Sequence, residues 1–188
     1  MDWITAIQSY TPQDPFEAAE KDAILNFAQN TQDVLLRKST LAHATASGYV
    51  MNPARTRVLM IYHNIYNSWS WTGGHADGET DLFEVAKREV AEETGLTDLY
   101  APVHTPLSVE ILPVKAHIKN GGAVPCHLHL NVTYLFIAEE TVPLRIKPDE
   151  NSGVKWLCAD ALANDVTEPD MLQLYNKLTE KARKIQIV

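Results

Sequence analysis

The chain has 188 residues, of which 45% are hydrophobic and 21% are charged, and its formal net charge is −8. This length corresponds to one domain, residues 1–188, with room for a hydrophobic core. The negative charge argues against a nucleic-acid polymer or an anionic membrane as partner, because both attract basic surfaces. The apolar runs are also too short to cross a bilayer, so no membrane span is expected.

The sequence contains two cysteines, Cys126 and Cys158, and no basic and apolar leader follows Met1. Two isolated thiols in a domain of this size are typical of a reducing compartment. A secretory signal would need a charged segment followed by a longer apolar one. These features predict reduced cysteines and a cytoplasmic protein.

An N-terminal helical extension is predicted at about residues 14–37. Asp14 is a favourable N-cap, Pro15 suits the first helical position, and Glu17 follows three residues after the cap. Apolar residues recur at helical spacing and predict an inward face. The residues of that predicted face are Phe16, Ala19, Ala23 and Phe27.

Five later segments have the composition of β-strands between turn signals. Asn52-Pro53 marks the turn after the first of them, and Asn120-Gly121-Gly122 marks a later one. The predicted strands are, in chain order, residues 45–51, 57–63, 106–117, 126–138 and 154–158.

Two more helices are predicted among these strands. One runs from about Asp81 to Thr94, follows a glycine-rich loop at residues 73–78, and ends at Gly95 as its C-cap. The last helix has one apolar stripe, which consists of Met171, Leu174, Leu178, Ala182 and Ile185. The order helix, hairpin, helix, strands, helix predicts an α/β fold in which a mixed sheet has helices on both faces.

The helix predicted at residues 81–94 has three carboxylates on one face, because residues three and four apart are neighbours on a helix. They are Glu89, Glu92 and Glu93. They lie beside the apolar sector, and each like-charge pair costs about 0.2–0.5 kcal/mol. Lys87 and Arg88 point elsewhere on the helical wheel and offset this repulsion in part. A magnesium ion would resolve it, because such ions bind oxygen ligands and join carboxylates to phosphates. The alternative is a solvated acidic face.

The segment that contains this helix resembles the Nudix box, G-x5-E-x7-R-E-U-x-E-E-x-G-U, in which U is a bulky aliphatic residue. The spacing over residues 74–96 is that of the box, without a gap. The matching positions are Gly74, Arg88, Glu89, Val90, Glu92, Glu93, Gly95 and Leu96. The resemblance implies the family fold, which is an α/β/α sandwich with a mixed β-sheet.

The same resemblance implies a set of site residues. Magnesium, or manganese in its place, would be bound by the backbone carbonyl of Gly73 and by the three glutamates Glu89, Glu92 and Glu93. Arg88 would orient a glutamate. The family often adds a late acid before a Trp-containing strand, and Glu150 stands six residues before Trp156. Either Glu89 or Glu150 would accept a proton from the attacking water, and Glu89 is ranked first.

Two positions depart from the family pattern. The box glutamate between the glycine and the arginine falls on Thr80, whereas Glu79 comes one residue early. In the family that acid helps to hold the arginine, so Glu79 would have to replace it from a shifted position. Thr72 stands where many relatives have Pro before the paired glycines.

Polar and apolar residues alternate in the strand predicted at residues 126–138. His127, His129, Asn131 and Thr133 form its polar face. The simpler interpretation is a solvent-facing or hydrogen-bonded surface, and the functional one is that His127 and His129 bind the substrate. His75 lies within the expected glycine loop, where a loop-stabilising hydrogen bond is the favoured role.

The resemblance therefore predicts a magnesium-dependent hydrolase. It would cut a pyrophosphate bond in a nucleoside diphosphate linked to another group, or in a similar small phosphorylated substrate. Two alternatives remain open, an enzyme similar to isopentenyl diphosphate isomerase and a non-catalytic Nudix-fold binding module. The isomerase chemistry needs a cysteine near the glycine loop, and Cys126 is far along the chain. The resemblance also allows a homodimer.

Overall fold

The computed structural model describes residues 1–119 and 121–186. Asn120 of the predicted turn therefore lies outside the described residues, and its neighbour Gly121 has a φ of 78°, in the left-handed region. None of the helices in the described ranges has the length and hydrophobicity needed to span a bilayer.

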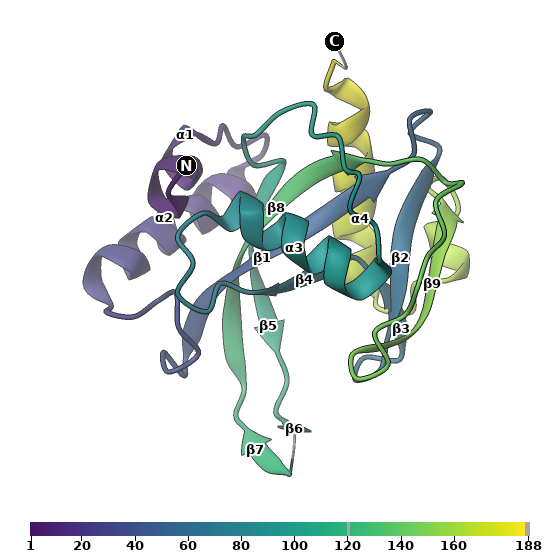
Figure 1. The fold of residues 1–188 in the computed structure, drawn as a ribbon. Helices are drawn as coiled ribbons and strands as arrows, with labels where there is room; N and C mark the ends of the chain where they lie inside the picture. The colour runs from purple at the N-terminus through teal and green to yellow at the C-terminus, as the bar shows by residue number, and fades with distance from the viewer. Residues whose placement is uncertain (120, 187–188) are drawn as a thin grey trace.

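A mixed sheet forms the centre of the fold (Figure 1). Its main path is β3-β2-β1-β8-β5; β4 also pairs with β1, and β9 pairs with β2. The pairing of β1 with β8 is parallel, whereas the other pairings in this sheet are antiparallel. The strands are β1 (Ala42–Met51), β2 (Arg57–His63), β3 (Ser68–Ser70), β4 (Thr72–His75), β5 (Ser108–Val114), β8 (His127–Ile137) and β9 (Asn151–Cys158).

Helices cover both faces of this sheet, so the predicted α/β/α sandwich is confirmed (Figure 1). One hydrophobic cluster joins the sheet to α1 (Trp3–Ser9), α2 (Pro15–Asn30) and α3 (Leu82–Thr94). A second cluster joins the opposite face to α4 (Pro169–Lys184) and to the short 3-10 helix at Leu162–Asn164.

Several predicted boundaries need correction. The strand predicted at residues 45–51 begins at Ala42, and the last strand begins at Asn151 rather than at residue 154. The segment predicted at residues 106–117 is β5 followed by a separate hairpin of β6 (His117–Lys119) and β7 (Gly122–Val124). Gly73 to His75 belong to β4 rather than to a loop, because their backbone pairs with β1.

The capping prediction for α2 is confirmed, but of its predicted inward face only Phe27 packs against the core. The Asp14 carboxylate accepts hydrogen bonds from the backbone N–H groups of residues 16 and 17. Phe16, however, is 82% exposed, and Ala19 and Ala23 are exposed as well. The buried residues of α2 are Ile24 and Glu17, an acid that the apolar spacing did not place in the interior.

Glu17 is buried because a cation from the last helix meets it. Its carboxylate forms ion pairs with Lys181 and with Lys177, the latter at 2.9 Å, and it accepts a hydrogen bond from Tyr10. Burial raises the pKa of Glu17, but the Gln13 N–H and these side chains outweigh it and lower the pKa to about 2. Lys181 also donates to the Leu107 carbonyl at 3.2 Å, so this pair connects α2 and α4 to the start of β5.

We expect Glu17→Gln to lower the free energy of unfolding at pH 7 by about 3 kcal/mol, because Lys181 would remain buried without its counter-charge. The lowered pKa makes the contribution of Glu17 complete above its ordinary value of 4.5 and lost as pH falls towards about 2. Urea unfolding across this pH range tests both points. Asp22→Asn, an exposed change on the same helix, is the control and should change stability little. Equal stability of Glu17→Gln and the parent at pH 7 would contradict the account.

Candidate active site

Helix α3 brings two of the predicted glutamates to its buried side. The Asp81 carboxylate caps its first turn by accepting from the Phe83 N–H, and Gly95 ends it in the left-handed conformation, with φ 81°. Between these caps Leu82, Val85, Ala86 and Val90 pack into the core. Glu89 and Glu93 lie along that side and are 9% and 3% exposed, whereas the side chain of Glu92 is 44% exposed.

The paired glycines of β4 allow this close approach. A Cβ added at Gly74 would lie 2.3 Å from the carboxylate carbon of Glu89, so that carboxylate occupies the space of a side chain. The N–H of Gly73 donates to Glu93 Oε2 at 3.0 Å. Glycine at position 74 is therefore required by the approach of the helix, whereas a Cβ at Gly73 would meet Ser47 of the neighbouring strand β1.

The burial of these two carboxylates is only partly compensated. Desolvation raises the pKa of Glu89, against a hydrogen bond from Arg88, and the charge of Glu92 adds to the rise. Desolvation also raises the pKa of Glu93 well above its ordinary value, although the Gly73 N–H lowers it; the charges of Glu150 and Glu89 act in the same direction as burial. An additional positive charge at this place would stabilise the ionised forms.

Arg88 meets the acidic face more closely than the helical wheel predicted. Its guanidinium lies 3.2 Å from Glu89 Oε1 and 3.7 Å from Oε1 of Glu92, which is four residues further along the helix. The Glu79 carboxylate instead accepts from the N–H groups of Thr80 and Asp81 at the start of α3. In the described structure, Glu79 thus serves the helix start, and Arg88 is held by the helix's own glutamates.

Lys147, which the sequence analysis did not identify, joins Glu150 to Glu92 of α3. Lys147 Nζ lies 3.0 Å from Glu92 Oε2 and 3.1 Å from Glu150 Oε2. Burial lowers the pKa of Lys147, but its hydrogen bonds with Glu92 and Glu150 outweigh that effect and raise the pKa. No pattern in the sequence marks Lys147, because its role depends on where the loop before β9 meets α3.

That loop is fixed to the C-terminal end of α3 by backbone contacts. The Arg145 N–H donates to the Thr94 carbonyl at 2.9 Å, and the Asn151 side-chain amide donates to the Glu93 carbonyl at 3.0 Å. Both bonds satisfy terminal carbonyls that the helix itself leaves unpaired. Glu150 is therefore positioned by a loop that is tied to the helix carrying Glu92 and Glu93.

The polar side chains of β8 do not face open solvent. They line the cavity or form hydrogen bonds with side chains of neighbouring strands. His127 and His129 line the cavity together with His43 and His75. Burial and the neighbouring histidines lower the pKa of His129 to about 2, so this imidazole is neutral near pH 7. Asn131 is buried and accepts hydrogen bonds from Thr45 and Ser47 of β1, at 2.9 and 3.0 Å.

The charged and imidazole side chains of the site line one cavity of about 1310 Å³. Glu89, Glu92, Glu93 and Glu150 contribute to its wall, as do Arg88, Lys147 and the histidines. Both cysteines are free and exposed. The lining residues include Pro125 and His127 but not Cys126, whose sulfur accepts from the Ala116 N–H at 3.2 Å.

The class of this protein follows from its fold and site. The fold is an α/β/α sandwich, and in the site an acidic helix packs against a pair of glycines. The family model described as "NUDIX domain" matches residues 41–178, a range that includes β1, α3 and β9. The chain therefore belongs to the Nudix family. It is accordingly an enzyme of the Nudix hydrolase class, which acts on phosphoric anhydrides.

Solved structures agree with this fold. A C. elegans Ap4A hydrolase is 16% identical with a TM-score of 0.52, and the alignment covers 74% of this chain and 97% of that one. The E. coli dihydroneopterin triphosphate pyrophosphohydrolase is 16% identical with a TM-score of 0.56, covering 73% and 94%. RenU, a Nudix hydrolase from M. smegmatis, is 17% identical with a TM-score of 0.53, covering 79% and 89%. At these identities the likeness concerns the fold alone. No curated protein matches the sequence significantly.

We expect Gly74→Ala to lower hydrolytic activity about 100-fold, because the new methyl group would displace the Glu89 carboxylate. The carboxylate is the far end of a flexible side chain, so the fold should survive. Circular dichroism and thermal unfolding would check the fold, and phosphate release would measure the rate. Parent-like activity in a folded Gly74→Ala protein would contradict the claimed closeness of Glu89 and β4.

Proposed function

We propose that this protein hydrolyses a pyrophosphate bond in a nucleoside diphosphate linked to another group, and that magnesium bound by α3 supports the reaction. One observation carries the proposal. Two carboxylates, Glu89 and Glu93, are buried against the glycine pair of β4 with the third, Glu92, beside them. Burying uncompensated charge costs several kcal/mol per ion, and a bound cation would offset that cost.

The donor set suits magnesium. Carboxylate oxygens are the ligands that hard divalent ions prefer, and magnesium is usually held by a few carboxylates together with substrate phosphates. Glu89, Glu92 and Glu93 would supply these oxygens, and the Gly73 carbonyl would add another. Manganese accepts the same oxygen ligands and is the alternative ion.

Each neighbouring residue then has a role that its contacts support. When bound, magnesium ions neutralise pyrophosphate charge and activate water. Arg88 orients Glu89 and Glu92 through the ion pairs described above. Glu89 and Glu150 are the two candidates for accepting the proton of the attacking water, because both line the cavity. Lys147 positions Glu150 beside α3.

The cavity favours a substrate larger than pyrophosphate itself. Its volume of about 1310 Å³ exceeds that of a usual small-ligand pocket, and His127 and His129 provide polar groups for binding the substrate. Two of the structural neighbours are an Ap4A hydrolase and a dihydroneopterin triphosphate pyrophosphohydrolase. Both kinds of compound, together with nucleotide sugars and ADP-ribose, therefore belong in the first substrate panel.

The first test is magnesium-dependent phosphate release on that panel. We expect turnover of at least one compound, and we expect Glu92→Gln and Glu93→Gln each to reduce it about 100-fold or more, because metal ligation is lost. Glu180→Gln, an exposed change on α4, should leave the rate unchanged. Full activity in both site variants would disprove the metal role of these glutamates, and ligand binding without turnover would indicate a binding module.

The second test concerns Glu150. Glu150→Gln keeps the shape and removes the charge, so we expect the rate to fall about 100-fold with little change in thermal stability. Saturating magnesium should be used, so that a weakened metal site does not obscure the loss of a base. Glu180→Gln again serves as the matched control. Parent-like turnover by Glu150→Gln would leave Glu89 as the proton acceptor.

A further inference from the structure

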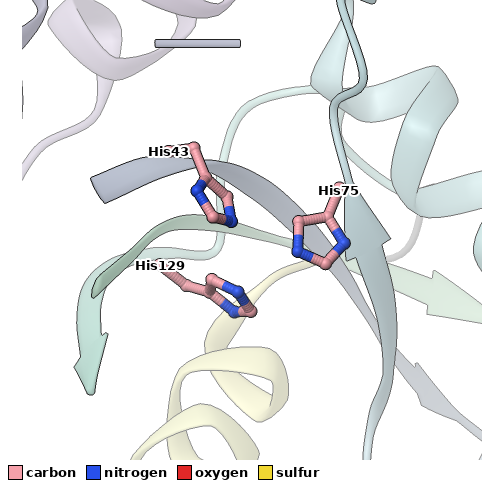
Figure 2. A group of neighbouring side chains, drawn as sticks. All are labelled: His43, His75 and His129. Carbon is pink, nitrogen blue, oxygen red and sulfur yellow. The ribbon is translucent and has the colours of Figure 1, made fainter. Parts of the chain in front are cut away.

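Three histidines of the cavity wall converge on one space (Figure 2). His43 comes from β1, His75 from β4 and His129 from β8. Their ring centroids lie 5.0 Å apart for His43 and His75, 5.2 Å for His43 and His129, and 5.0 Å for His75 and His129. One ring nitrogen of each lies within 4.8 Å of the other two. We call these three residues the histidine triad.

Strand register places the triad on the sheet. His43 pairs with His129 in the parallel ladder of β1 and β8, and Thr45, two residues further along β1, pairs with His75 of β4. Side chains of paired residues, and of residues two apart in a strand, lie on the same face. The triad therefore comes from three adjacent strands of one face, where small shifts of side chains suffice to close it around an ion.

This face is not the one that carries the glutamates. Ala44 and Ala46 of β1 point into the core that α3 shares, and Gly74, which contacts Glu89, pairs with Ala46. Thr45 and His43 point to the opposite face because side chains alternate along a strand. The triad and the α3 glutamates thus reach the same cavity from opposite faces of β4 and β1.

His43 has the arrangement of a metal-binding histidine. Its Nδ1 lies 3.0 Å from the Ser39 carbonyl, which can only accept, so Nδ1 carries the proton and donates. In the neutral ring, Nε2 consequently carries a lone pair. This atom is buried and has no hydrogen-bond partner among the described residues. The residue as a whole is 5% exposed. Metal-bound histidines commonly donate the other ring N–H to a backbone carbonyl, which fixes the ring and the tautomer.

A fourth imidazole stands beside the triad. His127 Nδ1 lies 2.9 Å from the Pro125 carbonyl, which fixes that ring in the same way. Its Nε2 lies 3.3 Å from His129 Nε2. This contact is a hydrogen bond between the two rings. Two nitrogens bound to one zinc ion at about 2.0–2.1 Å in tetrahedral geometry also lie about 3.3 Å apart, so an ion that displaces the shared proton could take both at this spacing.

We propose that the histidine triad binds a zinc-class divalent ion, with His127 as the nearest side chain for a fourth position. Imidazole nitrogens select zinc and similar transition metals over magnesium, which prefers oxygen. The bound ion would provide the missing partner for His43 Nε2 and would connect β4, β1 and β8. A bound ion would occupy His129, so the substrate would meet these histidines through the ion rather than directly; the glutamate site of the proposed function is unchanged by this inference.

The test is a cobalt and zinc titration in excess magnesium, which keeps the glutamates occupied. We expect one cobalt ion per chain, with the strong visible absorption of a four-coordinate site. Zinc should displace the cobalt. Binding of either ion should raise the melting temperature of the protein. His129→Gln and His43→Gln should lose this absorption. His104→Gln, an exposed histidine that stacks on Phe83, and Glu92→Gln should keep it.

A second measurement uses only the parent protein, so it does not depend on whether the variants fold. X-ray absorption of the zinc-loaded parent protein should show three or four imidazole nitrogens at about 2.0–2.1 Å. An oxygen-only shell, absence of tight cobalt binding, retention of the absorption in folded His129→Gln, or its loss in Glu92→Gln would each overturn the proposal.

Discussion

The close packing of α3 against the glycine pair of β4 is the constraint on which the site depends. The Glu89 carboxylate fills the space where a side chain at Gly74 would lie, and Glu93 accepts from the Gly73 N–H. This contact leaves two carboxylates buried and with raised pKa values. Lys147 pairs with the more exposed Glu92 and Glu150, and Arg88 divides its guanidinium between Glu89 and Glu92, so the buried charge of Glu89 and Glu93 is compensated only in part.

The sheet distributes two kinds of ligand between its faces. Alternation along β1 sends Ala44 and Ala46 towards α3 and sends His43 and Thr45 the other way. The carboxylates of α3 consequently lie on one side and the imidazoles on the opposite side, although both line the same cavity. Because β1 pairs with β4 and β8 at once, a single strand fixes the relative position of both groups.

Local signals in the sequence were sufficient for the helices whose N-caps are Asp14 and Asp81 and for the C-cap at Gly95, because caps depend on neighbouring residues. The spacing of the Nudix box also identified the fold and the three glutamates of α3. The predicted inward face of α2 was mostly wrong, since burial of Glu17 depends on Lys181, which lies far away in the chain. No local rule predicts that partner.

The same limit explains what was missed in the site. Lys147 meets Glu92 and Glu150 only after the loop before β9 is fixed to the end of α3. His43 and His129 are adjacent because β1 and β8 pair in parallel, and the register of that pairing does not follow from either strand alone. The sequence predicts a loop at Gly73 and Gly74 because their strand is short and because the atoms that require glycine there belong to β1 for Gly73 and to α3 for Gly74.

The central claim is that the glutamates of α3 form a magnesium site, and the most direct measurement is the anomalous scattering of manganese in crystals soaked with that ion. The account predicts a peak bonded to the carboxylates of Glu89, Glu92 and Glu93, at about 2 Å from their oxygens. An occupied manganese position elsewhere, with these three carboxylates free of metal and Glu92 still paired with Lys147, would contradict it.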